Sequence, residues 1–428
     1  MQVEPKVPRE IQEMVIDENK NDTVTLASSC LVNHAWYYRA HSHLFSRLCI
    51  RATLCAPSQV NINAADEFEE TDIPEALNPT FSFKKALEIL PYTFGGTVKH
   101  LVLTSASSTT RMKNAAQGIR LFRPELTACL VKAFIERFSE LESLTIEDVE
   151  WENCTQTQGH CDCIETMDRR GFTSLILRNV WHHSVQMNVT YVAQCAREIR
   201  ELVMEGLRYE ESERPLYKKL VVDSFTLGTA SCHQAVVVPD MQIGSLRTIN
   251  ITAMSYMDIK LVKALLERHG NFVHSLEMSV VVLSHRPSMW NDIGLRQCMV
   301  LRNFTLKCAI HPKDVEHNCA AQNMLLKIVA QLPRSNLTAL TLVFDTVLDA
   351  TATPETLLTS GNWERLAMQT ESFHELEQIT ISVTIPSNAV HEGQQKVAEF
   401  TKGIEDTIRG KIVESTSTKI EEYDDDEL

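Results

Sequence analysis

Two kinds of apolar segment are missing from this sequence of 428 residues. Residues 1–6 lack the apolar region that opens a secretory signal peptide. No apolar run approaches the roughly 18 residues that a membrane-spanning helix needs. We therefore expect a soluble protein that is not secreted, that has no membrane partner, and that works in the cytoplasm, the nucleus or both.

Positive charge is also scarce, and the formal net charge is −15 at pH 7. Nucleic-acid backbones and anionic membrane surfaces attract proteins through clustered Lys and Arg side chains. A chain with this balance disfavours both kinds of partner. We expect no nucleic acid and favour protein partners.

Local motifs for common catalytic and cofactor chemistry are absent as well. The sequence contains no G-x-G-x-x-G, no G-x4-G-K-S/T, no G-x-S-x-G and no H-E-x-x-H. The titratable pairs His182-His183 and Asp148 with Glu150 have no nucleophile or phosphate loop beside them in the sequence. We expect no catalytic residue, no cofactor and no enzymatic activity of the chain itself.

Cysteine is present, with 12 residues, but scattered through a long chain, so reduced thiols are expected rather than a disulfide framework. Two groups contain the residue types of a structural zinc site but lack the C-x2-C spacing, and we expect no metal at either. These groups are Cys154, His160, Cys161 and Cys163, and Cys308, His311, His317 and Cys319.

A six-residue pattern with apolar residues at its first, fourth and sixth positions organises most of the chain. Its clearest copy runs from Leu141 to Ile146. By strand alternation, positions four and six point into a core, and positions two, three and five point outward. The copies start at Val98, Leu141, Phe172, Ile199, Tyr217, Leu246, Val273, Leu301, Leu337 and Leu376.

Helical patterns recur between these hexapeptides, and several copies are spaced by about 28 residues. The predicted helices are 81–90, 125–138, 189–197, 258–269, 318–332 and 364–373. The hexapeptide resembles the L-x-x-L-x-L strand of a leucine-rich repeat. That resemblance implies an α/β solenoid, or horseshoe, of about ten strand units with helices on its convex side.

The repeats depart from the usual pattern three residues after the sixth position, where leucine-rich repeats carry Asn or Cys. Here apolar residues such as Val149 and Val180 occupy these positions. We expect an irregular horseshoe whose turns pack through apolar contacts, similar to the divergent repeats of many fungal F-box proteins. A different α/β fold with several parallel strands is the alternative.

The outward positions of the hexapeptides would form a concave face suited to binding a protein client. For any single residue, solvation without contact is the simpler reading. The candidate client contacts are Lys99, His100, Glu142, Arg200, Glu201, Lys218, Lys219, Arg247, His274, Glu277, Arg302 and Glu377.

Three short helices are predicted before the repeats, within residues 7–45, where Ile11, Met14 and Val15 share one helix face. Pro8-x-Glu10-Ile11, Leu26, Val32-Asn33-x-x-Trp36 and His43-Leu44-Phe45 resemble an F-box. That family docks on the Skp adaptor of cullin ubiquitin ligases. Carried over by position, the resemblance implies adaptor contacts at Pro8, Ile11, Val15, Leu26 and Val32, with Trp36 packed internally.

The F-box resemblance and the repeats together imply a substrate-recognition subunit of a Skp–cullin–F-box ubiquitin ligase. Such a subunit does no chemistry and binds a protein client that the sequence does not identify. The alternative is a repeat scaffold unrelated to ubiquitin ligation, whose first helices only cap the array.

Four segments follow from these patterns. We expect an F-box module at 1–50 and a linker with an acidic loop and an entry helix at 51–90. A leucine-rich-repeat-like solenoid would occupy 91–386. Residues 387–428 would form a capping helix, at 394–412, and an acidic disordered tail.

Overall fold

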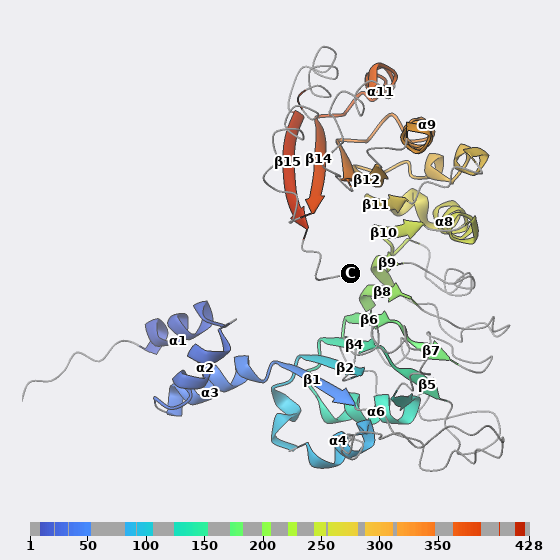
Figure 1. Cartoon of the computed structure of the whole chain (residues 1–428). Helices are drawn as coiled ribbons and strands as arrows, with labels where there is room; N and C mark the ends of the chain where they lie inside the picture. The colour runs from blue at the N-terminus through green and yellow to red at the C-terminus, as the bar shows by residue number, and fades with distance from the viewer. Residues whose placement is uncertain are drawn as a thin grey trace, which may run out of the picture. The chain divides into compact units, whose positions relative to one another are not determined.

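The protein is described from a computed structural model, shown in Figure 1. The residues described are 9–20, 22–32, 34–52, 82–90, 92–105, 124–152, 172–182, 199–206, 221–228, 244–253, 256–280, 287–310, 315–346, 363–386, 402 and 416–423. They form two compact units, which we treat separately: the first extends to Ile199 and the second begins at Arg200.

The first unit opens with three helices, α1 (Arg9–Glu18), α2 (Thr23–Ser29) and α3 (His34–Leu44), which we call the helical module. The sequence predicts all three. Asp22 starts α2, because its side chain accepts hydrogen bonds from the backbone N–H groups of Val24 and Thr25. The helices then pack around a small apolar core.

Strands of the first unit form a parallel sheet in the order β1-β2-β4-β6. Their bounds are β1 Arg47–Ala52, β2 His100–Ser105, β4 Ser143–Glu147 and β6 Ser174–Arg178. The helices beside them are α4 (Phe83–Ile89), the 3-10 helix η1 (Tyr92–Gly96) and α6 (Ala128–Arg137).

Strands of the second unit continue in sequence order from β8 to β15, and each pairing from β9 onward is parallel. Their bounds are β8 Ile199–Glu205, β9 Val222–Leu227, β10 Thr248–Ala253, β11 Ser275–Val280, β12 Asn303–Ile310, β13 Ala339–Thr346, β14 Gln378–Pro386 and β15 Thr416–Tyr423. Parallel strands need crossover connections, and helices supply several of them.

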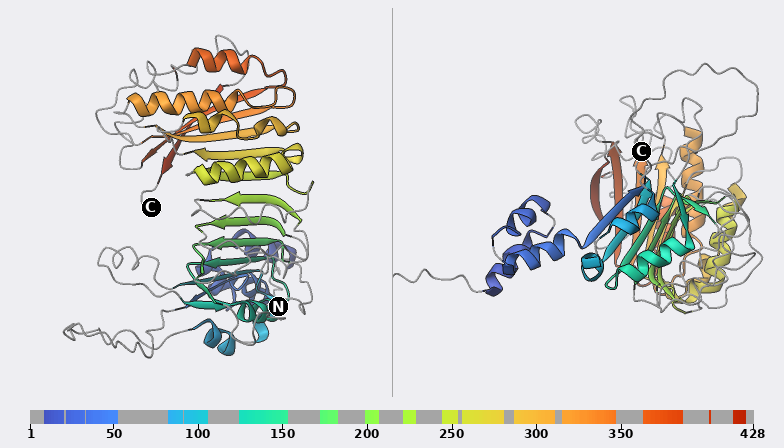
Figure 2. Two further views of the ribbon diagram at one scale, coloured as in Figure 1. Left: turned by 90° about the vertical axis from the view of Figure 1, so that its right-hand side faces the viewer. Right: turned by 90° about the horizontal axis from the view of Figure 1, so that it is seen from below.

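Helices of the second unit lie on one side of its sheet (Figures 1 and 2). They are α8 (Tyr256–His269), η4 (Gly270–Phe272), η5 (Pro287–Asn291), η6 (Leu295–Gln297), α9 (Val315–Val329) and α11 (Trp363–Thr370). The predicted helices at 258–269, 318–332 and 364–373 are therefore confirmed within a few residues at each end. The mixed α/β class with a large parallel sheet is confirmed too.

The hexapeptide pattern predicts the strands correctly for all copies but one. At positions four and six, Leu144 and Ile146 of β4 and Leu276 and Met278 of β11 are buried. Each buried Leu or Ile side chain contributes about 1.5–3 kcal/mol from removal of apolar surface from water. The repeated pattern therefore specifies a continuous apolar layer within each sheet.

The copy that starts at Tyr217 is the wrong frame. Strand β9 is Val222–Leu227, with Val222, Phe225 and Leu227 buried. The sequence offers two overlapping frames, since Val222 ends one apolar triplet and begins the next. Packing against neighbouring strands selects the second, which also lengthens the short interval after Ile199.

Main-chain hydrogen bonds repeat at the second hexapeptide position. The carbonyl of Lys99 accepts from the N–H groups of both Glu142 and Ser143, at 2.7 and 2.9 Å. The carbonyl of His274 accepts from Arg302 and Asn303 in the same way, at 2.9 and 3.0 Å. This repetition fixes the register, so residues at one position form a row across the strands.

A second, short parallel sheet, β3 (Glu125–Thr127), β5 (Glu150–Glu152) and β7 (Trp181–His182), was not predicted. Asp148 and Asn179, with φ of 56° and 49°, turn the chain from the main sheet toward it. Asp and Asn adopt this left-handed conformation more readily than most residues. The predicted apolar packing at Val149 and Val180 is confirmed, because both are buried.

Two strands fall in segments for which the sequence predicts no strand. Phe45-x-x-Leu48-x-Ile50 fits the hexapeptide pattern but lies in the stretch assigned to the F-box, and it contains β1. Part of the tail expected to be disordered, Thr416–Tyr423, forms β15, whose main chain pairs with β14. Backbone pairing needs no apolar pattern. The predicted helices at 189–197 and 394–412 lie outside the described residues, apart from Lys402.

Candidate functional site

The helical module has its own small core, formed by Ile16, Leu26 and Ala40. Trp36 packs against this core, as predicted, and its Nε1 donates a hydrogen bond of 2.6 Å to Gln12 Oε1. This bond satisfies the indole N–H at the edge of a largely apolar contact. The three helices therefore form a defined unit.

Charged groups join α1 to α3 beside this core. Arg39 Nε donates to Asp17 Oδ1 over 2.7 Å, and His43 Nε2 lies 2.8 Å from the same oxygen. These two hydrogen bonds, first from Arg39 and then from His43, lower the pKa of the Asp17 carboxyl well below its ordinary range. The carboxylate is thus held ionised between the helices.

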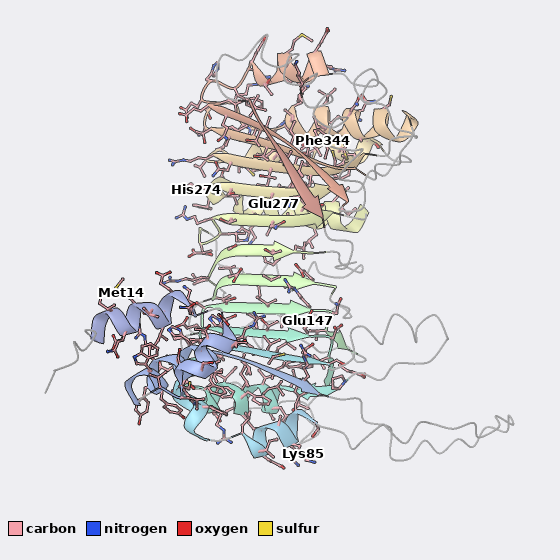
Figure 3. The ribbon with its side chains drawn as sticks, turned by 60° about the vertical axis from the view of Figure 1, so that its left-hand side comes forward. Met14, Lys85, Glu147, His274, Glu277 and Phe344 are labelled. Atoms are coloured by element: carbon pink, nitrogen blue, oxygen red, sulfur yellow. The ribbon has the colours of Figure 1, made fainter. Side chains whose placement is uncertain are left out.

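Several large apolar side chains of the module remain exposed. Ile11, Met14 and Val15 lie on one face of α1, at i, i+3 and i+4, and Leu31 and Val32 follow the end of α2. Leu31 is 88% exposed. Figure 3 shows Met14 pointing away from the other two helices. We call these five residues the module surface.

The predicted adaptor contacts divide into three groups. Ile11, Val15 and Val32 are exposed on the module surface. Leu26 is only 1% exposed and packs with Ile16 and Ala40, so its predicted place on a docking surface is wrong. Pro8 lies outside the described residues.

Met14 and Leu31 belong to the module surface, but they are not among the adaptor contacts that the F-box resemblance implies. The helical period does place Met14 beside Ile11 and Val15. Leu31 lies just beyond α2, whose buried residues are Leu26 and Ser29, and the sequence contains no signal that separates it from Leu26. Burial in so small a module depends on how three short helices cross.

The module is joined directly to the first sheet. Phe45 and Ser46 alone separate α3 from β1. The Phe45 ring lies 4.9 Å from the Phe94 ring of η1, and the Ser46 carbonyl accepts from Lys99 N at 2.8 Å. The predicted linker therefore cannot begin before β1 ends at Ala52.

Three predicted client contacts belong to the first unit. Lys99 Nζ lies 2.6 Å from Glu142 Oε1, and this hydrogen bond raises the pKa of Lys99. Both side chains are about half exposed, so the pair contributes little to stability. His100, the next residue along the chain and the first of β2, is also exposed. All three remain accessible to a partner.

The second unit carries the other candidates that the structure describes. Arg200, Glu201, Arg247, Arg302 and Glu377 are exposed. Glu277 of β11 is half-buried and forms an ion pair of 2.7 Å with Lys307 of β12, and His274, which directly precedes β11, is also half-buried. Figure 3 shows His274 at the start of β11 and Glu277 within it, with Glu277 on the face that carries no helices.

Lys218 and Lys219 lie outside the described residues. The Tyr217 frame puts them at positions two and three, but β9 follows the frame that begins at Val222. In the correct frame the outward residues of β9 are Asp223, Ser224 and Thr226. At the second position the structure therefore has an acidic residue, Asp223, where the Tyr217 frame puts Lys218.

The structure describes only part of the two groups that contain the residue types of a zinc site. The group that begins with Cys154 lies outside the described residues, as does His311 of the second group. In that second group Cys308 is buried in β12 and Cys319 lies on α9. Within the part of the chain that the structure describes, no three His, Cys, Asp or Glu residues are placed to hold a metal.

Tryptophan side chains often anchor a protein partner when they are exposed. Trp151 of β5 and Trp290 of η5 are 5% and 2% exposed, so both serve as core packing. The structure gives no burial for Trp181. Most of the exposed large apolar side chains on the described surface belong to the helical module, and they include Tyr37 and Tyr38 as well as the module surface.

Comparison with protein-family models and with curated proteins found no match. Over the described residues, no helix combines the length and apolar character needed to cross a membrane.

Proposed function

We propose that this protein is the substrate-recognition subunit of a Skp–cullin–F-box ubiquitin ligase. The observation that carries the proposal is the module surface: Ile11, Met14 and Val15 present a continuous apolar face on α1 although α1 also supplies Ile16 to the module's core. Exposed apolar residues gathered on one element are typical of a docking site.

In this proposal the module surface binds the Skp adaptor, and through it a cullin. The repeated parallel strands would form a leucine-rich-repeat-like solenoid that holds the protein client. The chain would do no chemistry, because its contribution is to keep the client near a ubiquitin-conjugating enzyme and raise the effective concentration of the reacting groups. Such a complex would act in the cytoplasm or the nucleus.

Co-purification with a Skp adaptor tests this function. Ile11→Asp and Val15→Asp each place a charge in the apolar contact, so each should abolish recovery of the adaptor. Met368→Asp is the matched control, because Met368 of α11 is exposed to a similar degree in the second unit. Leu26→Asp is unsuitable, since it would disrupt the module's own core. The proposal is rejected if wild type recovers no adaptor. It is also rejected if both module-surface variants recover the adaptor as wild type does.

A repeat scaffold capped by the first helices is the second candidate. The stacking of Phe45 on Phe94 and the direct passage from α3 into β1 favour it, because a cap must be fixed to its array. The same variants separate the two functions. For a cap, Ile11→Asp and Val15→Asp would change no partner, and disrupting the module's core would lower the melting temperature of the first sheet.

A further inference from the structure

A row of side chains crosses the second unit at the second hexapeptide position. Each member donates its backbone N–H to the carbonyl of the member before it, with N···O distances between 2.8 and 2.9 Å. Adjacent members are therefore one strand apart, about 4.8 Å. In strand order the row is Asp223, Arg247, His274, Arg302, Thr338 and Glu377.

The centre of this row is basic and its two ends are acidic. We call Arg247, His274 and Arg302 the basic row. Arg247 and Arg302 are exposed, and neither forms an ion pair with any residue that the structure describes. On a chain of net charge −15, these cations have not been neutralised by their neighbours.

The carboxylate of β11, the strand that directly follows His274, is already engaged. Glu277 pairs with Lys307 at 2.7 Å, so it does not compensate the charge of the basic row. His274 is oriented by its own backbone: Nδ1 lies 2.9 Å from the carbonyl oxygen of Phe272, which can only accept, so Nδ1 carries the proton. Its Nε2 is not used in that bond.

Small polar side chains cover the sheet face beside the basic row. They come from the third and fifth positions of the same strands, so they stand next to it on every strand. Apart from Glu277, which is paired with Lys307, they offer hydroxyl and amide groups and no large apolar surface. These side chains are Thr226, Thr248, Asn250, Ser275 and Thr305. A partner that binds here would be held by charge and hydrogen bonds.

We propose that the basic row binds a short acidic segment of a protein client, through the carboxylates of Asp and Glu. Arg247 and Arg302 are two strands apart, about 10 Å, and their long side chains can reach carboxylates two residues apart on one face of an extended chain, about 7 Å. A guanidinium can bind a carboxylate through two parallel hydrogen bonds. The inference rests on the proposed function, because it assigns a chemistry to the client.

The acidic ends of the row add a length requirement. Asp223 lies one strand before Arg247, and Glu377 lies two strands after Arg302. A long acidic run would bring its outer carboxylates toward these like charges, whereas a short acidic cluster flanked by Lys or Arg would match the whole row. Specificity would then come from repulsion as well as attraction.

Fluorescence anisotropy with the full-length chain tests this inference. The probe is a labelled extended peptide of about twelve residues with a central Asp/Glu cluster flanked by Lys, compared with its Asn/Gln counterpart of the same length. We expect the acidic peptide alone to bind, and added salt to weaken it. Arg247→Glu and Arg302→Glu should each weaken binding at least about tenfold.

Arg365→Glu provides the matched control, because Arg365 is exposed on α11 and the charge change is identical. It should alter the affinity less than about twofold. Equal loss in the control, or equal binding of the Asn/Gln peptide, would overturn the inference. Tighter binding of a phosphoserine peptide than of the Asp/Glu peptide would overturn the assignment to carboxylates.

Adaptor co-purification with the same variants separates this inference from the proposed function. Arg302→Glu should lose the acidic peptide and keep the adaptor. If the acidic peptide binds to wild type while no adaptor does, the ligase assignment fails and the acidic site stands. If the adaptor binds and the peptide does not, the acidic site is rejected alone.

Discussion

Gly95 lies directly against the main chain of Arg137: a Cβ atom added to Gly95 would stand 2.7 Å from the Arg137 carbonyl oxygen. The Gly95 carbonyl also accepts from Ser139 N at 2.9 Å. Arg137 in turn donates from Nη2 to the carbonyls of Leu87 and Leu90 at 2.9 and 3.0 Å. The end of α6 thus holds both η1 and the end of α4.

Gly95→Ala should therefore destabilise the first unit, because backbone atoms cannot yield as a flexible side chain can. We expect a loss of about 1–3 kcal/mol in the free energy of unfolding, measured by urea titration. The neighbouring Gly96→Ala is the control, since nothing lies within 4 Å of its added Cβ. It should be neutral or more stable by up to about 1 kcal/mol. Equal effects of the two substitutions would contradict this packing.

The sequence predicts the position of α6 but not the contact between Gly95 and Arg137. The period of the apolar residues locates α6 and the strands, because burial acts on every repeat in the same way. No period marks Gly95, which differs from Gly96 only in which residue lies opposite. Contacts between segments that are distant in the sequence need the structure.

The candidate site shows the same division. The hexapeptide frame correctly places Arg247, His274 and Arg302 in one row. It fails at Tyr217, where two frames satisfy the apolar rule and only packing decides. In the helical module the residue types select Leu26 as readily as Val32, yet one is core and the other surface. Strand periodicity is repeated many times, whereas each helix of the module occurs once.

Truncation of Leu26 should destabilise the helical module, whereas truncation of Val15 should leave its stability almost unchanged. Leu26→Ala removes a side chain from the core of the module and should cost about 2–5 kcal/mol of the module's stability. Val15→Ala removes an exposed side chain and should change stability by less than about 0.5 kcal/mol. Hydrogen exchange of the α1–α3 amides measures both. Equal protection in the two variants would contradict the assignment of Leu26 to the core.

Asp17 should make the helical module sensitive to acid. Its pKa is lowered in the folded chain, so it contributes stability above the ordinary carboxyl pKa of about 3.9, and this contribution is lost as pH falls below that value. The side chain is 37% exposed, so solvent screening keeps the effect small.

We expect protection of the α1 and α3 amides to fall as the pH is lowered below about 4 in wild type, and to fall less in Asp17→Asn. Glu18→Gln, which removes an exposed carboxylate from the same helix, is the control and should retain the wild-type profile. An Asp17→Asn profile that matches wild type throughout would show that the bridge to Arg39 and His43 contributes nothing.

Gln331 should be essential to the packing of α9 in the second unit. Its Oε1 accepts from Ile293 N at 2.9 Å, and its Nε2 donates to the carbonyls of Trp290 and Lys327 at 2.6 and 2.9 Å. Gln331→Leu keeps the volume but removes the hydrogen-bond partner of the buried Ile293 N–H and of the buried Trp290 carbonyl. We expect a loss of about 1–3 kcal/mol in urea titration. Gln297→Leu, at an exposed position, should change stability by less than about 0.5 kcal/mol.

The cysteines offer a chemical test of the sheet arrangement. Cys298 is buried beside η6, and burial raises the pKa of its thiol to about 12. Cys49 lies on β1 and is exposed. Alkylation requires the thiolate and access to it, so Cys298 lacks both in the folded protein. The sequence does not predict the strand β1. Because side chains alternate along a strand, and Leu48 and Ile50 point toward the core, Cys49 between them faces solvent.

Iodoacetamide labelling of the native chain, followed by peptide mass spectrometry, should therefore modify Cys49 and leave Cys298 unmodified. The two should label at similar rates in urea, where burial no longer separates them, and this denatured sample is the control for intrinsic reactivity. Rapid native labelling of Cys298 would mean that the segment around η6 opens readily. Protection of Cys49 would instead mean that another part of the protein, or a second copy, covers β1.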